Sequence, residues 1–229
     1  NGKARYITPA GEIGRSIFVY NPATKAWNYF DKEGNRVTGR QYIDGHLYYF
    51  KEDGSQAKGE IIEENGIKYY YEPESGILAS GRYLQVGDDQ WMYFKQDGSL
   101  AIGQVRADHG YLKYFDKNGI QVKGKTVVED GKTYYYDAHS GALVTSSFAE
   151  IAPNQWSYFN TDGQALKGKW TINGKEYYFD ENGIQYKGKA IKVGSRYKYY
   201  DENDGQPVTN RFAQIEPNVW AYFGADGYA

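Results

Sequence analysis

A short repeat runs through the chain and constrains its fold more than any other feature. A turn glycine recurs at regular intervals from Gly34 to Gly227, and Gly11 closes an earlier, partial repeat. Ten turn glycines lie from Gly34 to Gly227, and an aromatic pair precedes each of them. A period of roughly 20–22 residues is typical of arrays in which each repeat packs mainly on its neighbours. The first member of each pair is a tyrosine: Tyr29, Tyr49, Tyr70, Tyr93, Tyr114, Tyr135, Tyr158, Tyr178, Tyr199 and Tyr222.

A longer period lies on top of the short one. Trp27, Trp91, Trp156 and Trp220 follow one another at nearly equal intervals, each as long as three short repeats, so the repeats are grouped in triplets. The first repeat of each triplet carries Trp-x-Tyr-Phe, and the second ends in Gly-x-Gln-x-Lys-Gly or a close variant. The third tends toward three consecutive tyrosines and a slightly longer turn.

Each repeat is predicted to form a β-hairpin. Asn-Gly or Asp-Gly between two short strands is the strongest local hairpin signal, because both turn residues need positive φ. Longer turns are expected in the Trp-bearing repeats, as at 151–155 and 215–219. The two-residue turns are Asp44–Gly45, Asn65–Gly66, Asp130–Gly131 and Asn173–Gly174.

These patterns predict an all-β fold, a β-solenoid of stacked β-hairpin repeats with three repeats in each longer period. No window of a dozen residues shows the apolar period of a helix. A lone hairpin is marginal in water, whereas stacked hairpins can bury their aromatic residues, which make up 17% of the chain. We expect one domain over residues 1–229, with about ten hairpins, a truncated repeat at 1–11 and a chain that is a fragment of a longer protein.

Composition excludes several classes of function. The chain has no cysteine, so disulfides, thiolate nucleophiles and cysteine zinc sites are excluded. The net charge is −2 and no basic block is present, which argues against nucleic-acid binding. No apolar run approaches the roughly 18 residues of a membrane helix, so no membrane insertion is expected. No cofactor is predicted.

The acidic residues do not suggest catalysis or metal binding. Seven aspartates occupy turn positions of the repeat, where an aspartate bonds its own backbone, and they do not converge as a glycosidase pair must. The three histidines fall at unrelated positions, and the stretch 201–205 lacks the ligand pattern of an EF-hand. We therefore predict no enzyme activity and no metal site. The turn aspartates are Asp31, Asp97, Asp116, Asp137, Asp162, Asp180 and Asp201.

One complete repeat runs from Gly168 through Tyr178 and Phe179 to Gln185, Lys187 and Gly188. It resembles the cell-wall-binding or glucan-binding repeats of streptococcal and related glucansucrases, and the resemblance extends from about Trp27 onward. It implies a non-catalytic module that binds an α-glucan polysaccharide, dextran or mutan, within an extracellular or cell-surface glucosyltransferase acting on sucrose. The catalytic barrel of that family is absent from this sequence.

Choline-binding repeats share this hairpin pattern, and they place a tryptophan directly after the linking glycine. A choline cage needs several aromatic faces around a quaternary ammonium. Here that position is never aromatic and is often cationic, which favours sugar over choline. A choline-type cell-wall anchor and a host-glycan- or protein-binding array of the clostridial-toxin kind remain alternatives. The residues at this position are Arg40, Glu60, Arg82, Gln104, Lys125, Lys169 and Lys189.

The second repeat of each triplet offers a candidate sugar site. A tyrosine can stack on a glucose ring, while Gln and Lys two positions apart project to one side and can bond its hydroxyls. The alternative is that the tyrosines are packing residues and the Gln-Lys pairs are solvated loops. The ring could also be the preceding residue, which is Tyr48 and Tyr177 but Lys113 in the middle set, or a third-repeat tyrosine (Tyr70, Tyr135 or Tyr199). The predicted sets are Tyr49, Gln56 and Lys58; Tyr114, Gln121 and Lys123; and Tyr178, Gln185 and Lys187.

Overall fold

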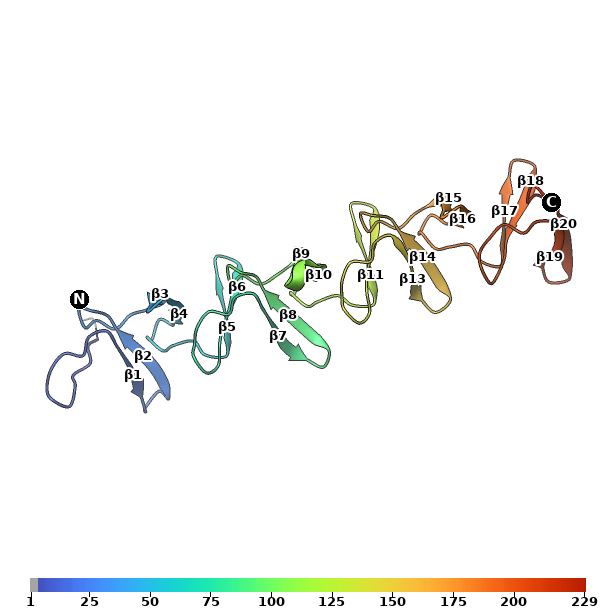
Figure 1. The fold of residues 1–229 in the computed structure, drawn as a ribbon. Coiled ribbons are helices and arrows are strands. Elements are labelled where there is room, and N and C mark those ends of the chain that lie inside the picture. Colours follow the sequence, from blue (N-terminus) through green and yellow to red (C-terminus); the bar gives the residue numbers. More distant parts are fainter. Residues whose placement is uncertain (1–3) are drawn as a thin grey trace. The chain divides into compact units, whose positions relative to one another are not determined.

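The computed structural model describes residues 4–229 and is almost entirely β-structure (Figure 1). Ten two-stranded sheets follow one another along the described chain, and each is a hairpin of consecutive strands. The only helical element in residues 4–229 is a short 3₁₀ turn, η1 (Asp108–Gly110). The predicted all-β hairpin repeat is therefore confirmed.

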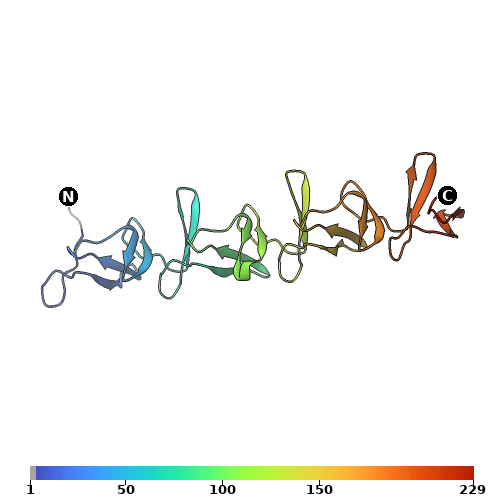
Figure 2. The same cartoon turned by 45° about the horizontal axis from the view of Figure 1, so that its top comes forward.

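The strands are short, and each repeat contributes one pair. Figure 2 shows the same succession of paired strands from the blue end to the red end. The pairs are β1 (Ile17–Asn21) with β2 (Ala26–Phe30), β3 (Gly39–Ile43) with β4 (His46–Phe50), β5 (Glu60–Glu64) with β6 (Ile67–Tyr71), β7 (Arg82–Gly87) with β8 (Gln90–Phe94), β9 (Gly103–Arg106) with β10 (Leu112–Phe115), β11 (Lys125–Glu129) with β12 (Lys132–Tyr136), β13 (Ser147–Ala152) with β14 (Gln155–Phe159), β15 (Gly168–Ile172) with β16 (Lys175–Phe179), β17 (Lys189–Val193) with β18 (Arg196–Tyr200) and β19 (Arg211–Glu216) with β20 (Val219–Phe223).

The hairpins group into two compact units. Unit 1 comprises the residues up to Tyr111 together with Phe115–Gln121, and unit 2 comprises Leu112–Tyr114 and Val122–Ala229. Unit 1 therefore holds β1 to β9, unit 2 holds β11 to β20, and β10 is divided between them. Each unit is built from the same kinds of contact between successive hairpins.

Positive backbone angles close the predicted two-residue turns. Asp44 and Gly45 have φ of 49° and 85°, and Asn173 and Gly174 have φ of 51° and 76°. The other two predicted pairs behave alike, so all four turns are confirmed. Glycine reaches these angles without steric cost, and Asn and Asp tolerate them better than most other residues.

Three of the four Trp-bearing repeats differ from the prediction of longer turns, including those at 151–155 and 215–219, whereas the first has a four-residue turn between Asn21 and Ala26. Strand β13 continues to Ala152 and β14 begins at Gln155, and the register shifts between Glu150 and Ala152. Strands β19 and β20 show the same shift before a two-residue turn. The extra residue is accommodated as a β-bulge within the strand, which leaves the turn short.

The second member of every aromatic pair forms the core. Nine of these side chains are completely buried and the tenth, Phe30, is 7% exposed. Successive strand residues point to opposite faces, so the tyrosine before each of them faces the other way. The completely buried rings are Phe50, Tyr71, Phe94, Phe115, Tyr136, Phe159, Phe179, Tyr200 and Phe223.

Each hairpin packs on the next in two ways. The first ring of one pair contacts the second ring of the next, as in Tyr70 with Phe94, whose centroids are 5.7 Å apart. The linking loop also bonds back to the preceding hairpin, since Leu100 N donates to Lys68 O at 2.8 Å. These contacts recur within each unit and make the stacked arrangement of a β-solenoid, because each hairpin buries its aromatic face on its neighbour.

Candidate functional site

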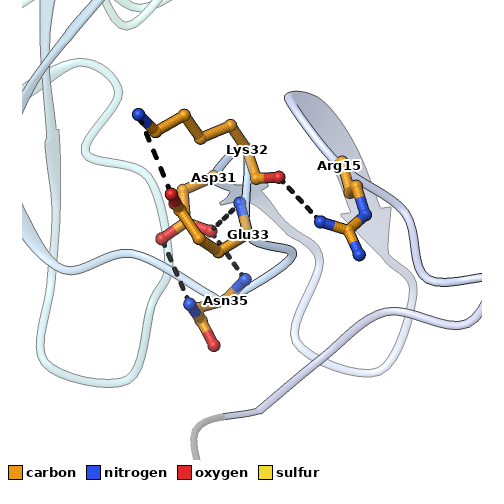
Figure 3. A network of polar contacts seen from close by, with 5 residues as sticks. All are labelled: Arg15, Asp31, Lys32, Glu33 and Asn35. Atoms are coloured by element: carbon orange, nitrogen blue, oxygen red, sulfur yellow. Dashed lines mark hydrogen bonds and ion pairs between the residues drawn. The ribbon is translucent and has the colours of Figure 1, made fainter.

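Six of the seven turn aspartates accept hydrogen bonds from their own backbone, as predicted, whereas in the repeat of Asp162 the acceptor is Asn160. In unit 1 the Oδ1 atom of Asp31 accepts from Glu33 N at 3.0 Å and from Asn35 N at 2.8 Å (Figure 3). Lys32 and Arg15 complete this surface network, through an ion pair with Glu33 and a bond from the Arg15 guanidinium to Lys32 O. The carboxylates are thus used to close loops. Across residues 4–229, no group of three or more His, Asp or Glu is arranged to hold a metal.

The predicted stacking tyrosines lie between hairpins. The rings of Tyr49 and Tyr71 have centroids 5.9 Å apart, and those of Tyr178 and Tyr200 are also 5.9 Å apart. Tyr114 packs on Tyr136 at 5.6 Å. One side of each predicted platform therefore contacts the next hairpin, and its role toward a sugar stays a prediction.

In unit 1 the first predicted Gln-Lys pair donates hydrogen bonds to the turn of the following hairpin. Gln56 is buried, and its Nε2 amide donates to Ser75 O at 3.0 Å. Lys58 Nζ donates to Glu74 O at 2.6 Å and lies 5.9 Å from the centre of the Trp27 ring. The pair is thus held by the next hairpin and projects beside a tryptophan.

The equivalent pair in unit 2 has the same partners. Gln185 Nε2 reaches Asp204 O at 3.4 Å, and Lys187 Nζ donates to Asn203 O at 3.0 Å. The Lys187 ammonium lies 5.5 Å from the centre of the Trp156 ring. Because the arrangement recurs two triplets along the chain, it follows from the repeat and not from a local accident.

A cavity of about 200 Å³ opens beside the pair in unit 2. The Phe148 and Tyr177 rings meet edge to face in its wall, with centroids 5.0 Å apart. Three aromatic side chains therefore surround two polar groups, an amide and an ammonium. The cavity is lined by Phe148, Trp156, Tyr177, Gln185, Lys187 and Asp204.

Unit 1 holds the corresponding aromatic cluster. Phe18 meets Tyr48 edge to face at 5.4 Å, matching Phe148 and Tyr177. Burial raises the pKa of Tyr48 above its ordinary value, and its neutral hydroxyl can donate a hydrogen bond. A cluster in unit 1 thus matches the residues that line the cavity in unit 2. It consists of Phe18, Trp27, Tyr48, Gln56 and Lys58.

The middle set departs from this pattern. Lys113 stands where Tyr48 and Tyr177 stand in the others, and it is buried. The ring corresponding to Phe18 and Phe148 is Tyr83, whose hydroxyl donates to Asp108 Oδ1 at 2.6 Å. Gln121 belongs to unit 1, whereas Tyr114 and Lys123 belong to unit 2. The two complete clusters therefore lie in the first and third triplets.

The sugar-binding role predicted for Gln56, Lys58, Gln185 and Lys187 stays a prediction, and the structure places a different ring of the tandem beside the pair in unit 2. Tyr177, and not Tyr178, shares the cavity with Gln185 and Lys187. Phe148 and Trp156, from the preceding hairpin, were not selected. The recurrence of Phe18 and Trp27 as Phe148 and Trp156 was the available signal.

The position after the linking glycine also bears on the ligand. The Arg40 guanidinium lies 4.2 Å from the centre of the Tyr69 ring and pairs with Glu64. The Lys189 ammonium lies 5.5 Å from the centre of the Tyr186 ring. At these places the chain's own cations cover the aromatic faces that a quaternary ammonium would need.

Comparison with known proteins points to one family of repeats. The model of the choline-binding repeat matches residues 22–53, 37–83, 108–148 and 168–212, and that of a putative cell wall binding repeat matches 147–165. These models describe binding repeats and not catalytic domains. No helix within residues 4–229 has the length and apolarity needed to cross a membrane.

The similar curated proteins are much longer than this chain. Glucosyltransferase-S of Streptococcus mutans is 36% identical over 206 residues, which are 89% of this chain and 14% of the relative. Glucosyltransferase-I of Streptococcus downei is 38% identical over 207 residues, which are 89% of this chain and 13% of the relative. The chain thus spans about one seventh of the relatives it matches.

Solved structures share the fold. The modular autolysin LytC of Streptococcus pneumoniae superposes with a TM-score of 0.70 at 18% identity, over 97% of this chain and 50% of that chain. Choline binding protein F of the same organism superposes with a TM-score of 0.66 at 19% identity, over 100% and 89%. At these identities the similarity establishes the hairpin-repeat fold alone.

Proposed function

The chain belongs to the choline-binding repeat family, and from this premise we propose that it is a non-catalytic module that binds α-glucan. The binding sites in this proposal are the two clusters around Trp27 and Trp156, each taking one or two sugar rings of a polymer. The proposal treats residues 1–229 as one binding region with dextran or mutan as its ligand. Its parent would be an extracellular or cell-surface glucosyltransferase acting on sucrose.

The cavity in unit 2 carries the proposal. Carbohydrate rings present an apolar face and a rim of hydroxyls, and binding pockets meet them with an apolar wall and a few polar groups. Phe148, Trp156 and Tyr177 supply the wall. The oxygen of the Gln185 amide can accept a hydrogen bond from a sugar hydroxyl, and the Lys187 ammonium has donors beyond the one used on Asn203 O.

The same cavity argues against choline. Three aromatic rings alone would resemble a cage for a quaternary ammonium. However, the Lys187 ammonium already lies 5.5 Å from the centre of the Trp156 ring. A second cation beside it would be repelled, whereas a neutral sugar would gain a hydrogen-bond donor. This placement favours glucan over choline despite the name of the family.

The relatives support the choice of glucan. Two of them bear the name glucosyltransferase and match over 89% of this chain. A module beside such an enzyme would hold polymer near the site where it is extended. The repeats of cell-wall proteins with the same fold support placement outside the cell.

Affinity electrophoresis in gels with and without high-molecular-weight dextran tests the proposal. We expect strong retardation of the native chain and its loss in the double variant Gln56→Leu, Gln185→Leu. Leucine is chosen because Leu78, Leu100 and Leu143 occupy the same repeat position in other hairpins, so packing should survive. Retardation unchanged in the double variant would move the sites elsewhere.

Two further gels separate the alternatives. Retardation that millimolar choline abolishes, with no response to dextran, would identify a choline anchor. Binding to host glycans without binding to dextran would identify the toxin-like array. Circular dichroism of each variant, with its aromatic signal, checks that a lost response does not reflect unfolding.

A further inference from the structure

A second, larger cavity lies in unit 1, away from both clusters. Its volume is about 460 Å³, and it lies over the β5–β6 hairpin beside the loops that follow β8 and β10. None of the residues of the Trp27 cluster lines it. The lining residues that bear on its chemistry are Glu63, Lys68, Tyr69, Lys95, Asp97 and Lys117.

The cavity gathers lysines from three successive hairpins. Lys68 lies on β6, Lys95 follows β8, and Lys117 follows β10. None of the three takes part in the ion pairs found within residues 4–229. Lysines that line one cavity outside such pairs favour an anion there.

Two carboxylates, those of Glu63 and Asp97, line the same cavity. Asp97 accepts from the Ser99 amide at 2.9 Å and from its hydroxyl at 2.6 Å, and the hydroxyl bond in particular holds the pKa of Asp97 below its usual value. Asp97 therefore stays ionised, with its Oδ1 atom closing the turn and its charge offset in part by Lys95. Glu63 and the remaining oxygen of Asp97 are acceptors for the hydroxyls of a ligand.

Unit 2 contains a sister cavity that lacks lysine at these three positions. It has a volume of about 440 Å³ and lies over the β11–β12 hairpin, one triplet along the chain. At the places of Lys68 and Lys117 it carries Thr133 and Glu181. The position of Lys95 is Asn160 in that triplet. The two cavities thus share a fold but differ in charge: three lysines and two carboxylates line the unit 1 cavity, whereas one lysine, Lys167, and one carboxylate, Glu181, line the unit 2 cavity.

We propose that the unit 1 cavity is a second carbohydrate site, which binds an acidic polysaccharide bearing carboxylates. Lys68, Lys95 and Lys117 pair with the carboxylates, while Glu63, Asp97 and Ser99 bond the hydroxyls. The exposed Ile67 and Ile102 side chains, together with Tyr69, offer the apolar surface for the sugar rings. The proposal does not depend on α-glucan binding by the Trp27 and Trp156 clusters.

Two probes with one backbone test the proposal on the full chain. Polygalacturonate carries a carboxylate on each sugar, whereas the fully methyl-esterified polymer carries none. We expect retardation by polygalacturonate and not by the ester, weakened by salt because exposed ion pairs are screened. The variant Lys68→Thr, Lys95→Asn, Lys117→Glu, which carries the unit 2 residues at these three positions, should lose roughly tenfold or more in affinity.

A charge-matched variant supplies the control. Lys25, Lys175 and Lys192 are exposed and line none of the cavities described here. Changing them to Asn, Thr and Glu respectively alters the net charge equally and should leave the affinity unchanged. Equal loss in both variants, or equal binding of the esterified polymer, would overturn the proposal. Dextran retardation of every variant reports separately on the Trp27 and Trp156 clusters.

Discussion

At the scale of single residues, one contact links the candidate sites to the fold. An ideal Cβ on Gly76 would lie 2.2 Å from Gln56 Nε2, and one on Gly205 would lie 2.0 Å from Gln185 Nε2. Both glycines also have positive φ, 72° and 67°. The amide side chains of Gln56 and Gln185 therefore lie directly against the turn of the next hairpin. Each turn requires glycine, Gly76 or Gly205, at the point of contact.

The variant Gly76→Ala tests this contact. Gly45 has φ of 85° with open space around it, so Gly45→Ala adds only the strain of left-handed backbone, about 1–2 kcal/mol. Gly76→Ala should cost more than this and should also displace Gln56. Urea unfolding measures the loss of stability in each variant. Adding Gln56→Ala to Gly76→Ala should restore part of the stability that Gly76→Ala loses. Equal losses at the two glycines would show that Gln56 is not constrained by this turn.

Burial also gives one tyrosine a distinct pH response. Tyr71 is completely buried, and desolvation raises its pKa to about 12. Between the ordinary pKa near 10 and this value, the unfolded chain releases the proton and the folded chain keeps it, so stability falls as pH rises through that window.

The variant Tyr71→Phe should remove this part of the alkaline response. Phenylalanine already occupies the same position in Phe50 and Phe94, so stability at pH 7 should change little. At pH 11 the variant should be more stable than the native chain by about 1 kcal/mol. Urea midpoints at the two pH values measure the difference. An equal alkaline loss in both proteins would contradict the assignment.

At the scale of elements, local signals predicted the hairpins well, whereas the ring that lies beside each Gln-Lys pair could not be read from them. The turns at Asp44–Gly45 and Asn173–Gly174 depend on backbone angles that only a few residue types accept, and therefore could be read directly from the sequence. The choice between Tyr177 and Tyr178 could not. Adjacent strand residues face opposite sides, and which side meets the next hairpin depends on stacking. The bulge near Ile151 was missed for a similar reason, because an extra residue can enter the strand or the turn.

The hairpin is also the unit in which stability should be lost. Phe94 is completely buried and packs on Tyr70, so Phe94→Ala should cost about 3–5 kcal/mol. In a stacked array such a loss spreads mainly to nearest neighbours. Amide hydrogen exchange should therefore show lost protection in β5 to β8 and retained protection in β15 to β20. Uniform loss over the whole chain would mean that the hairpins unfold together.

At the scale of the whole molecule, binding strength should come from the number of sites. One ring stacked on aromatic side chains with two or three hydrogen bonds corresponds to a dissociation constant of about 1 mM. Two such sites on one polymer can gain roughly 10²–10⁴-fold without new contacts. The proposed module would therefore bind long chains well and short ones weakly.

Comparing the native chain with a variant that lacks one of the two proposed sites measures this gain in affinity. With Gln185→Leu alone, affinity for long dextran should fall to nearly that of a single site, whereas isomaltotriose should bind the remaining Trp27 cluster with unchanged affinity. Isothermal titration calorimetry gives both affinities and the number of sites. Equal molar affinities of dextran and isomaltotriose for the native chain would rule out multivalent binding.

The stacking contacts have a consequence for how such a chain can change in length. Each hairpin presents one kind of surface to its predecessor and another to its successor, and the kinds recur only every third hairpin, as Trp27, Trp91 and Trp156 mark. Deleting or duplicating one whole triplet therefore rejoins surfaces that already fit. Deleting one hairpin instead brings unlike surfaces together. Homologous recombination within the gene should consequently leave viable descendants that differ by whole triplets, gaining or losing one Trp-bearing repeat at each event.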